Sequence, residues 1–359
     1  MLKKLFVQSA ISATILFIAG WTHAEENNSS NNIAATNVHI TQMGRAEKTS
    51  DGSARFSYPG VTFMLNTKAD SLSMVASSNS GNGWLDIIVD ETTPNVIQLS
   101  KEPQTYELFH FPTIGKHTVR IINRTETWQA INTINKFELN KGEFLTASKL
   151  PSRKLMVLGD SVTCAEMIDR VPGEKPNARW NNARESYGML IATALHAQVQ
   201  LVCMGGHGLV RTWDNKTNSL NLADFYPLAI PNEGSTVAWD EKLYEPDVIV
   251  SAIGTNDFSP GIPDREHYVN TYVKFLLKVL ADHKHAQIFI TEGAILNGEK
   301  KAVLVDYLTE TLKRVNDKRV HIATSTYYPG DNTDAHPTKE QHAAMAKDLE
   351  PQIKKVMEW

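Results

Sequence analysis

The stretch KLMVLGDSVTC, residues 154–164, places a short apolar run directly before a polar turn that contains glycine. Such a run, without alternation, is typical of a strand that is buried on both faces of a parallel sheet. Four later runs of the same form cover residues 199–203, 247–253, 287–290 and 319–323. Helical stretches accompany them at residues 187–196, 265–283, 299–316 and 339–357. The alternation predicts an α/β fold of flavodoxin-like, three-layer α/β/α type with a five-stranded parallel sheet.

The residues before this stretch follow a different pattern. Short alternating runs, separated by turn residues, cover residues 54–65, 71–76, 84–89, 96–99, 105–111, 117–122 and 135–139. Many short strands at this spacing predict a jelly-roll-like antiparallel β-sandwich. The pair Pro59-Gly60 predicts a turn or bulge inside the first run. We therefore expect a β-sandwich domain at residues 38–148 and an α/β domain at residues 149–359.

The N-terminus has the composition of an export signal. Lys3 and Lys4 precede an apolar stretch at residues 5–21, and Thr22-His23-Ala24 supplies small residues after it. This order predicts a secretory signal peptide at residues 1–24, cleaved after Ala24. A membrane anchor is the alternative, because the apolar stretch is near the lower length limit for spanning a bilayer. From the signal peptide we expect a secreted or periplasmic protein without stable membrane association. Residues 25–37 are rich in Asn and Ser, which predicts a disordered tail.

The composition excludes some classes of partner. The chain has 359 residues, a formal charge of −4 and 42% hydrophobic residues. No stretch gathers Lys and Arg into a stripe, so we do not expect nucleic acid as a partner. The histidines are scattered without the spacing of a zinc site, and we expect neither a metal nor a cofactor.

Four polar blocks follow predicted strands or precede the last helix. Open α/β sheets place their active sites at the carboxyl ends of the strands, where three of these blocks fall. Each block alone is also an ordinary turn or loop. The blocks are Gly159-Asp160-Ser161, Gly205-Gly206-His207-Gly208, Gly254-Thr255-Asn256-Asp257 and Asp334-Ala335-His336-Pro337.

The residue types in these blocks suggest nucleophilic catalysis. A serine such as Ser161 needs a base within hydrogen-bond reach, and His336 stands on a loop that could return to it. Glycines after a strand present backbone N–H groups to an oxyanion, and the Asn256 amide is a neutral donor. Asp257 suits a structural hydrogen-bonding role better than a second catalytic role. Pro337 favours the start of a helix, which leaves His336 on the loop before it.

In this order the blocks resemble the Ser-Gly-Asn-His hydrolase superfamily. Further blocks narrow the resemblance, and they lie at residues 56–61, 117–119, 124–126, 159–164 and 206–211. Together they resemble carbohydrate esterase family 2 over about residues 44 to 350. That family joins a β-sandwich to a Ser-Gly-Asn-His hydrolase domain and removes acetyl groups from plant polysaccharides. The resemblance implies an acetylated carbohydrate such as xylan or mannan as substrate.

The resemblance also implies a role for each matching residue. Ser161 is expected to attack the acetyl carbonyl, and His336 to accept its proton and then protonate the leaving sugar hydroxyl. The N–H groups of Ser161 and Gly206, with the Asn256 side chain, are expected to hold the oxyanion. We expect His207 and Trp213 to contact substrate.

One position departs from the superfamily pattern. The superfamily usually has Asp three residues before its His, where this chain has Thr333. Asp334 lies only two residues before His336, so either Asp334 or a backbone carbonyl is expected to orient the ring.

Two further features stay open. Cys164 and Cys203 end neighbouring predicted strands or turns, and they form either a disulfide or two buried free thiols. Trp180, Trp213 and Trp239 fall in two long segments, 166–185 and 212–245, that are candidate walls of a sugar-binding cleft. Simple packing is the alternative for each indole ring.

Three functions therefore compete. An exported polysaccharide deacetylase is the leading hypothesis. A GDSL-type lipid or aryl esterase is the second, although no apolar lid segment lies near the site. A carbohydrate-binding protein with an inactive esterase domain is the third, and the four retained blocks argue against it.

Overall fold

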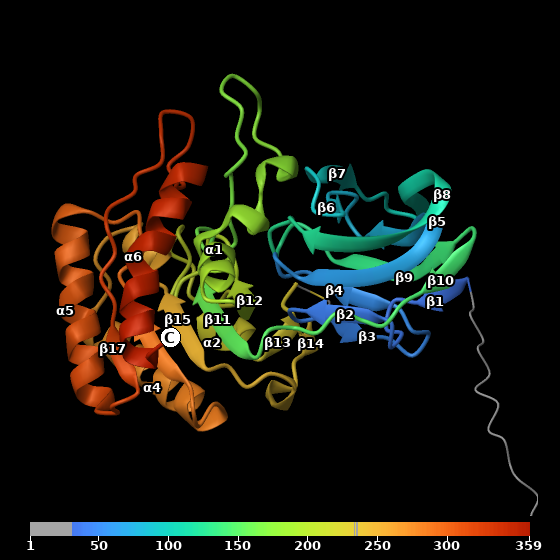
Figure 1. Cartoon of the computed structure of the whole chain (residues 1–359). Coiled ribbons are helices and arrows are strands. Elements are labelled where there is room, and N and C mark those ends of the chain that lie inside the picture. The colour runs from blue at the N-terminus through green and yellow to red at the C-terminus, as the bar shows by residue number, and fades with distance from the viewer. Residues whose placement is uncertain (1–30, 233, 235) are drawn as a thin grey trace, which may run out of the picture.

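A β region and an α/β region follow each other along the chain (Figure 1). The computed structural model describes residues 31–359 apart from 233 and 235. The predicted signal peptide at residues 1–24 lies outside the described residues. Within the described part, no helix is both long and apolar enough to span a membrane.

The β region is one antiparallel sheet of ten strands that folds back on itself. Its central path runs β3-β4-β9-β5-β8-β6-β7, while β1 joins β9, and β2 and β10 join β5. The register places Phe56 of β4 level with Ser78 at the far end of β5, through Asn132 of β9. The Phe56 ring centroid is nevertheless 5.2 Å from that of Phe63, near the start of β5, so the sheet folds over and two layers enclose a core. The strands are β1 (Asn32–Ala34), β2 (Ile40–Met43), β3 (Glu47–Lys48), β4 (Ala54–Phe56), β5 (Thr62–Ser78), β6 (Trp84–Val89), β7 (Asn95–Gln98), β8 (Gln104–Asn123), β9 (Asn132–Leu139) and β10 (Gly142–Phe144).

Two strands are longer than the sequence predicts. The runs 105–111 and 117–122 belong to the single strand β8, and the run 71–76 belongs to β5. A register shift between Ala69 and Ser71 lets the β5–β8 ladder bend where a turn was expected. The predicted turn at Pro59-Gly60 is confirmed, because β4 ends before it and Gly60 has a φ of +76°.

The predicted disordered tail is partly ordered. Strand β1 lies within the predicted tail, 25–37, and pairs antiparallel with β9, with Ile33 opposite Phe137. The prediction is wrong at these positions, because the edge of β9 supplies backbone partners that the local composition does not reveal. Ile33 is also buried there, at 7% exposed.

The α/β region confirms the predicted five-stranded parallel sheet. Its order is β12-β11-β15-β16-β17, and every pair in it is parallel. The strands are β11 (Arg153–Gly159), β12 (Ala197–Cys203), β15 (Val248–Ala252), β16 (Gln287–Ile290) and β17 (Val320–Ile322). A separate hairpin joins β13 (Leu228–Ile230) to β14 (Val237–Ala238). The α-helices are α1 (Tyr187–Ala194), α2 (Leu222–Phe225), α3 (Thr255–Phe258), α4 (Arg265–Asp282), α5 (Gly298–Val315) and α6 (Lys339–Met357).

Alternate residues of the interior strand β11 enter two different cores. Leu155 and Val157 pack in the cluster that contains the buried faces of α1 and α6. Met156 and Leu158 pack in the cluster that contains those of α4 and α5. Full burial of each such side chain stabilises the fold by about 1.5–3 kcal/mol, which explains the unbroken apolar run. The chain leaves β11 toward β12 on one side and returns to β15 on the other, so a crevice opens at their carboxyl ends.

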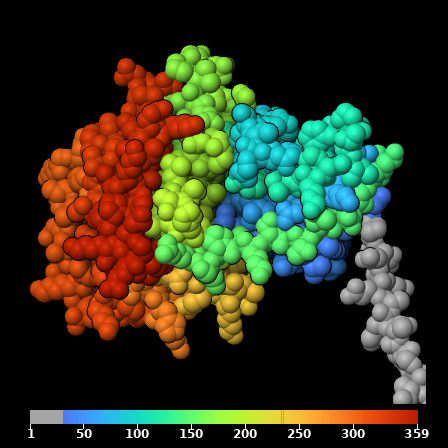
Figure 2. Space-filling view, in the orientation of Figure 1, coloured from blue at the N-terminus to red at the C-terminus, as the bar shows by residue number. Residues whose placement is uncertain are grey.

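The two regions contact each other through buried polar bonds. Arg124 of the β region donates to Asp86 at 2.7 Å and, across the interface, to Asp169 at 2.6 Å. Arg45 is 1% exposed and reaches the Leu228 carbonyl at 3.1 Å. Figure 2 shows the two regions in contact along one side. Because buried charges must keep their partners, these bonds fix how the regions sit on one another.

Candidate active site

The turn after β11 presents a serine hydroxyl to the crevice. Ser161 is 8% exposed and lines a cavity of about 880 Å³. Backbone bonds close the turn, from the Cys164 N–H to the Asp160 carbonyl and from the Glu166 N–H to the Ser161 carbonyl, each 3.0 Å long. The Asp160 side chain turns inward and accepts from the Val162 N–H at 3.1 Å. Burial raises the pKa of Asp160 to about 6.

The loop before α6 brings a histidine and an aspartate to this serine. His336 Nε2 lies 2.8 Å from Ser161 Oγ, and His336 Nδ1 lies 2.6 Å from Asp334 Oδ1. The same Asp334 oxygen accepts the backbone N–H of His336 at 2.8 Å. The two-residue spacing is therefore long enough for the Asp334 carboxylate to reach the His336 ring. Of the two alternatives for the partner of His336 Nδ1, Asp334 and not a backbone carbonyl is the one in the structure.

The histidine loop is held from both ends. Asp331 accepts the Thr333 N–H at 2.8 Å and pairs with the Arg170 guanidinium at 3.0 Å. At the other end, the Gln341 side chain of α6 binds both the N–H and the carbonyl of Gly330. These contacts restrict where His336 can lie, which suits a base that must stay within reach of one hydroxyl.

The charges around His336 favour its protonated form. Burial disfavours the charged ring, but the hydrogen bond to Asp334 and the charges of Glu166, Asp334 and Asp160 outweigh burial and raise the pKa of His336 above its usual value. Glu166 Oε2 is 3.9 Å from His336 Nε2. A ring in this setting accepts a proton readily and stabilises the cation that results.

The three predicted oxyanion donors line the same cavity as the serine. Gly206 has a φ of +76°, a conformation that favours glycine, and its carbonyl accepts the Trp213 N–H at 2.9 Å. Among the described residues, the N–H groups of Ser161 and Gly206 have no hydrogen-bond partner. Asn256 Nδ2 donates to the His207 carbonyl at 2.9 Å.

Asp257 has the structural role that was expected of it. Its carboxylate accepts the N–H groups of Leu209 at 2.8 Å and Val210 at 2.7 Å, and it is completely buried. Its backbone carbonyl accepts from the Arg211 guanidinium at 2.6 Å. Asp257 therefore fixes the loop that follows the glycine block.

The cavity is built from both regions of the chain. Trp213 and His207 line it, and Trp213 is 62% exposed. Three residues of the β region complete it, namely Asn79, Trp128 and Ile131. The other two candidate tryptophans do not line the cavity. Trp180 is buried in the core at 2% exposed. The Trp239 ring lies against Arg45, whose guanidinium carbon is 5.3 Å from the ring centroid.

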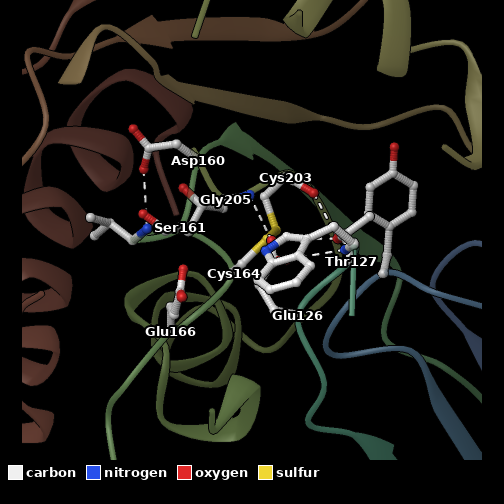
Figure 3. Close-up of a disulfide and its surroundings, with 12 residues drawn as sticks. Glu126, Thr127, Asp160, Ser161, Cys164, Glu166, Cys203 and Gly205 are labelled. Atoms are coloured by element: carbon white, nitrogen blue, oxygen red, sulfur yellow. Dashed lines mark hydrogen bonds between the residues drawn. A yellow bond between two sulfur atoms is a disulfide. The ribbon is translucent and has the colours of Figure 1, made fainter. Parts of the chain in front are cut away.

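The two cysteines form a disulfide beside the site (Figure 3). Cys164 follows the serine turn and Cys203 ends β12, and their Cα atoms are 5.6 Å apart. Of the two alternatives left open by the sequence, the disulfide is the one in the structure. It ties the turn that carries Ser161 to the strand that leads into the glycine block.

Comparison with known proteins decides the family. A model described as the N-terminal part of carbohydrate esterase 2 matches residues 42–148, and one described as GDSL-like lipase/acylhydrolase matches residues 155–349. An acetylxylan esterase/glucomannan deacetylase of Cellvibrio japonicus (strain Ueda107) is 53% identical over 331 residues, 92% of this chain and 92% of that protein. The chain belongs to carbohydrate esterase family 2.

Solved structures support the same membership. A family two carbohydrate esterase from Cellvibrio japonicus superposes with a TM-score of 0.90 at 53% identity, covering 91% of this chain and 98% of that one. A family two carbohydrate esterase from Clostridium thermocellum, in complex with cellohexaose, has a TM-score of 0.83 at 27% identity, covering 89% and 99%. This family 2 esterase is therefore a carboxylic ester hydrolase, which confirms the esterase activity of the leading hypothesis over a binding protein. Export stays a prediction.

Sequence reasoning missed several residues of the esterase site. Trp128 and Asn79 belong to the β region and reach the cavity only through tertiary packing, so no local pattern marks them. Glu166 lines the cavity, and Glu126 lies beneath the glycine block, where its Oε1 is 2.6 Å from the Gly205 nitrogen. Glu126 falls in a block that carried the family resemblance, which was the available signal.

Proposed function

We propose that this family 2 esterase removes O-acetyl groups from polysaccharide through an acetyl-enzyme intermediate at Ser161. The observation that carries the proposal is the line of hydrogen bonds from Asp334 through His336 to Ser161, which ends in the cavity. A nucleophile, its base and the group that orients the base are the parts that acyl transfer by serine needs.

In the first half of the reaction, Ser161 Oγ attacks the acetyl carbonyl and His336 Nε2 takes its proton. The carbonyl oxygen becomes an oxyanion, which the N–H groups of Ser161 and Gly206 and the Asn256 amide stabilise. One such donor contributes about 10²–10³ in rate. His336 then gives the proton to the sugar oxygen, the acetyl–oxygen bond breaks, and the deacetylated sugar leaves.

In the second half, water replaces the sugar. His336 takes a proton from the water, which attacks the acetyl carbonyl of the ester on Ser161 and forms the oxyanion again. The bond to Ser161 Oγ breaks, His336 returns the proton to that oxygen, and acetate leaves. The Asp334 carboxylate holds the ring in the required tautomer through both halves.

The walls of the cavity support a sugar as the alcohol part of the ester. Exposed indole rings of Trp128 and Trp213 offer flat apolar surfaces, and Asn79 and Asn232 add polar groups. The relative at 53% identity is named an acetylxylan esterase/glucomannan deacetylase. We therefore propose acetylated xylan and glucomannan as the substrates, and we propose His207 and Trp213 as substrate contacts.

We expect this enzyme to release acetate from acetylated xylan and glucomannan and to prefer 4-nitrophenyl acetate over the octanoate ester by more than about tenfold. A long alkyl chain in this cavity would displace water from polar groups such as the Asn79 and Asn232 amides without offering them a hydrogen bond. Acetate release and the kcat/KM series for acetate, butyrate and octanoate esters measure this. Preference for octanoate would favour the GDSL-type lipid or aryl esterase instead.

We expect Trp213→Ala to raise KM for an acetylated xylo-oligosaccharide by about 5- to 30-fold, as loss of one aromatic contact implies. The change should leave kcat/KM for 4-nitrophenyl acetate within about threefold, because that ester has no sugar to stack on the ring. Trp213→Phe keeps an aromatic face and should retain most of the affinity. Equal losses on both substrates would place Trp213 outside the sugar subsite.

We also propose an export signal and a domain boundary for this chain. We propose that residues 1–24 direct export and are cleaved after Ala24, supported by the Lys-apolar-small pattern there. We propose the domain division at residues 148 and 149, supported by the change from antiparallel pairing in β10 to parallel pairing in β11. A secreted or a periplasmic location would suit an enzyme that acts on polysaccharide.

A further inference from the structure

We infer that Glu126, a residue of the β region, is a positioning residue for the oxyanion donors of the α/β region. The inference rests on the proposed function, since it concerns the same site. It makes the β region part of the catalytic scaffold and not only a neighbour that completes the cavity. The sequence of contacts runs from Glu126 to Gly205 and from Gly205 to the adjoining peptide of Gly206.

Glu126 binds two backbone segments that line the cavity. It lies just after β8 and is completely buried. Its Oε1 accepts the Gly205 N–H at 2.6 Å and its Oε2 accepts the Trp128 N–H at 3.1 Å. Figure 3 shows Glu126, Gly205 and the disulfide close to Ser161. One carboxyl group therefore joins the peptide before the oxyanion loop to the wall that carries the Trp128 indole.

The neighbouring residue, Thr127, also binds this segment. Thr127 Oγ1 donates to the Cys203 carbonyl at 2.7 Å, and the Thr127 carbonyl accepts from Asn232 Nδ2 at 3.0 Å. The β region thus fixes a carbonyl and an N–H group on the segment from Cys203 to Gly205. Two successive glycines have unusually free backbone angles, so external bonds are needed to hold the Gly206 N–H toward the cavity.

A side chain at Gly205 would press against two carboxylates. A Cβ atom there would lie 3.0 Å from Glu166 Oε2 and 3.2 Å from Glu126 Oε1. Burial and the nearby charge of Glu166 raise the pKa of Glu126 to about 8, against the effect of the N–H groups that it accepts. Glu126 can therefore hold a proton at neutral pH and still accept both N–H groups, so neutralising it is not by itself expected to release the loop.

Glu126→Gln tests whether the two hydrogen bonds that Glu126 accepts, and not its charge, hold the loop. The amide has the shape of the protonated carboxyl group, but its nitrogen cannot accept a hydrogen bond, so it opposes either the Gly205 or the Trp128 N–H. We expect kcat for 4-nitrophenyl acetate to fall by about 10- to 100-fold, less than full loss of one donor, with KM within about threefold. The inhibition constant of phenylboronic acid, whose tetrahedral serine adduct uses the oxyanion donors, should rise in parallel.

The matched control is Gln129→Ala. Gln129 Oε1 accepts from Asn181 Nδ2 at 2.7 Å, so this variant also loses a bond between the two regions. Among the described residues, however, Gln129 makes no hydrogen bond to the glycine segment. Its kcat and boronate affinity should stay within about twofold of the unaltered enzyme. If Glu126→Gln does not fold, as melting would reveal, Thr127→Val removes the bond to the Cys203 carbonyl and should lower kcat by about threefold or more, again with KM held.

The outcomes are distinct. Unchanged kcat and boronate affinity in Glu126→Gln, or equal losses in Gln129→Ala, would overturn the inference and leave the proposed function intact. If Glu126→Gln does not fold, unchanged kcat in Thr127→Val would likewise overturn the inference. If the unaltered enzyme formed no acetyl-enzyme at Ser161, the proposed mechanism would be wrong and the inference would fall with it.

Discussion

Ser161→Ala will lower kcat for 4-nitrophenyl acetate by about 10⁴- to 10⁶-fold, the range found when the nucleophile of a serine hydrolase is removed. The hydroxyl of Ser161 is 2.8 Å from His336 Nε2, and the proposed mechanism gives it a covalent role that no neighbour can assume. Steady-state kinetics, with titration of the acetyl-enzyme burst, measure the loss. The burst should disappear completely in the variant.

A second serine of the same cavity supplies the control. Ser259 lines the cavity, but its hydroxyl donates to the Thr255 carbonyl at 3.0 Å and not to a histidine. Ser259→Ala should therefore keep kcat within about threefold. His336→Ala should lose nearly as much as Ser161→Ala, and the double variant should lose no more, because the two residues act as a unit. Residual turnover above one per cent in Ser161→Ala would exclude Ser161 as the nucleophile.

The sequence predicted the α/β sheet well for a physical reason. A strand buried on both faces must be apolar at successive positions, as Leu155 to Leu158 are. A short segment of sequence is therefore enough to identify such a strand. The bounds of β16 and α6 agree with the predicted runs 287–290 and 339–357. The β region was harder, because the bend of β5 and β8 depends on pairing across the sheet and not on their own residues.

The residues of the site also differ in how well the sequence predicts them. Ser161, Gly206, Asn256 and His336 lie at strand ends or on the last loop, so topology alone brings them to one edge. Trp128 and Glu126 reach that edge only because the two regions dock, and no spacing in the chain encodes the docking. The residues that are hardest to predict are therefore those that come from the other region.

Asp334 illustrates a third case, in which a sequence rule misleads by one residue. The superfamily spacing favoured position 333, but Asp334 Oδ1 reaches both the ring and the backbone N–H of His336. This double contact is available to a residue two positions away, because a short side chain can cap the turn that it begins. The geometry therefore supports the orienting role without the usual spacing.

Asp334→Asn is accordingly expected to lower kcat by about 10²- to 10⁴-fold, with KM within a few fold, the upper limit being the effect of a triad aspartate. The amide oxygen can still accept the backbone N–H of His336, so the loop should keep its shape while the ring loses its anionic partner. Because that partner helps to raise the pKa of His336, the variant's ring should lose its proton at lower pH. The rise of kcat/KM with pH, which requires the neutral ring, should move in the acid direction.

Glu166→Gln separates charge from orientation in this comparison. Glu166 also raises the pKa of His336, but it lies 3.9 Å from Nε2 and makes no hydrogen bond to Nδ1. This variant should shift the pH profile in the same direction while losing far less kcat than Asp334→Asn. If both variants shift the profile equally and Asp334→Asn stays within a few fold of full activity, Asp334 contributes only charge, and the ring is held by its loop alone.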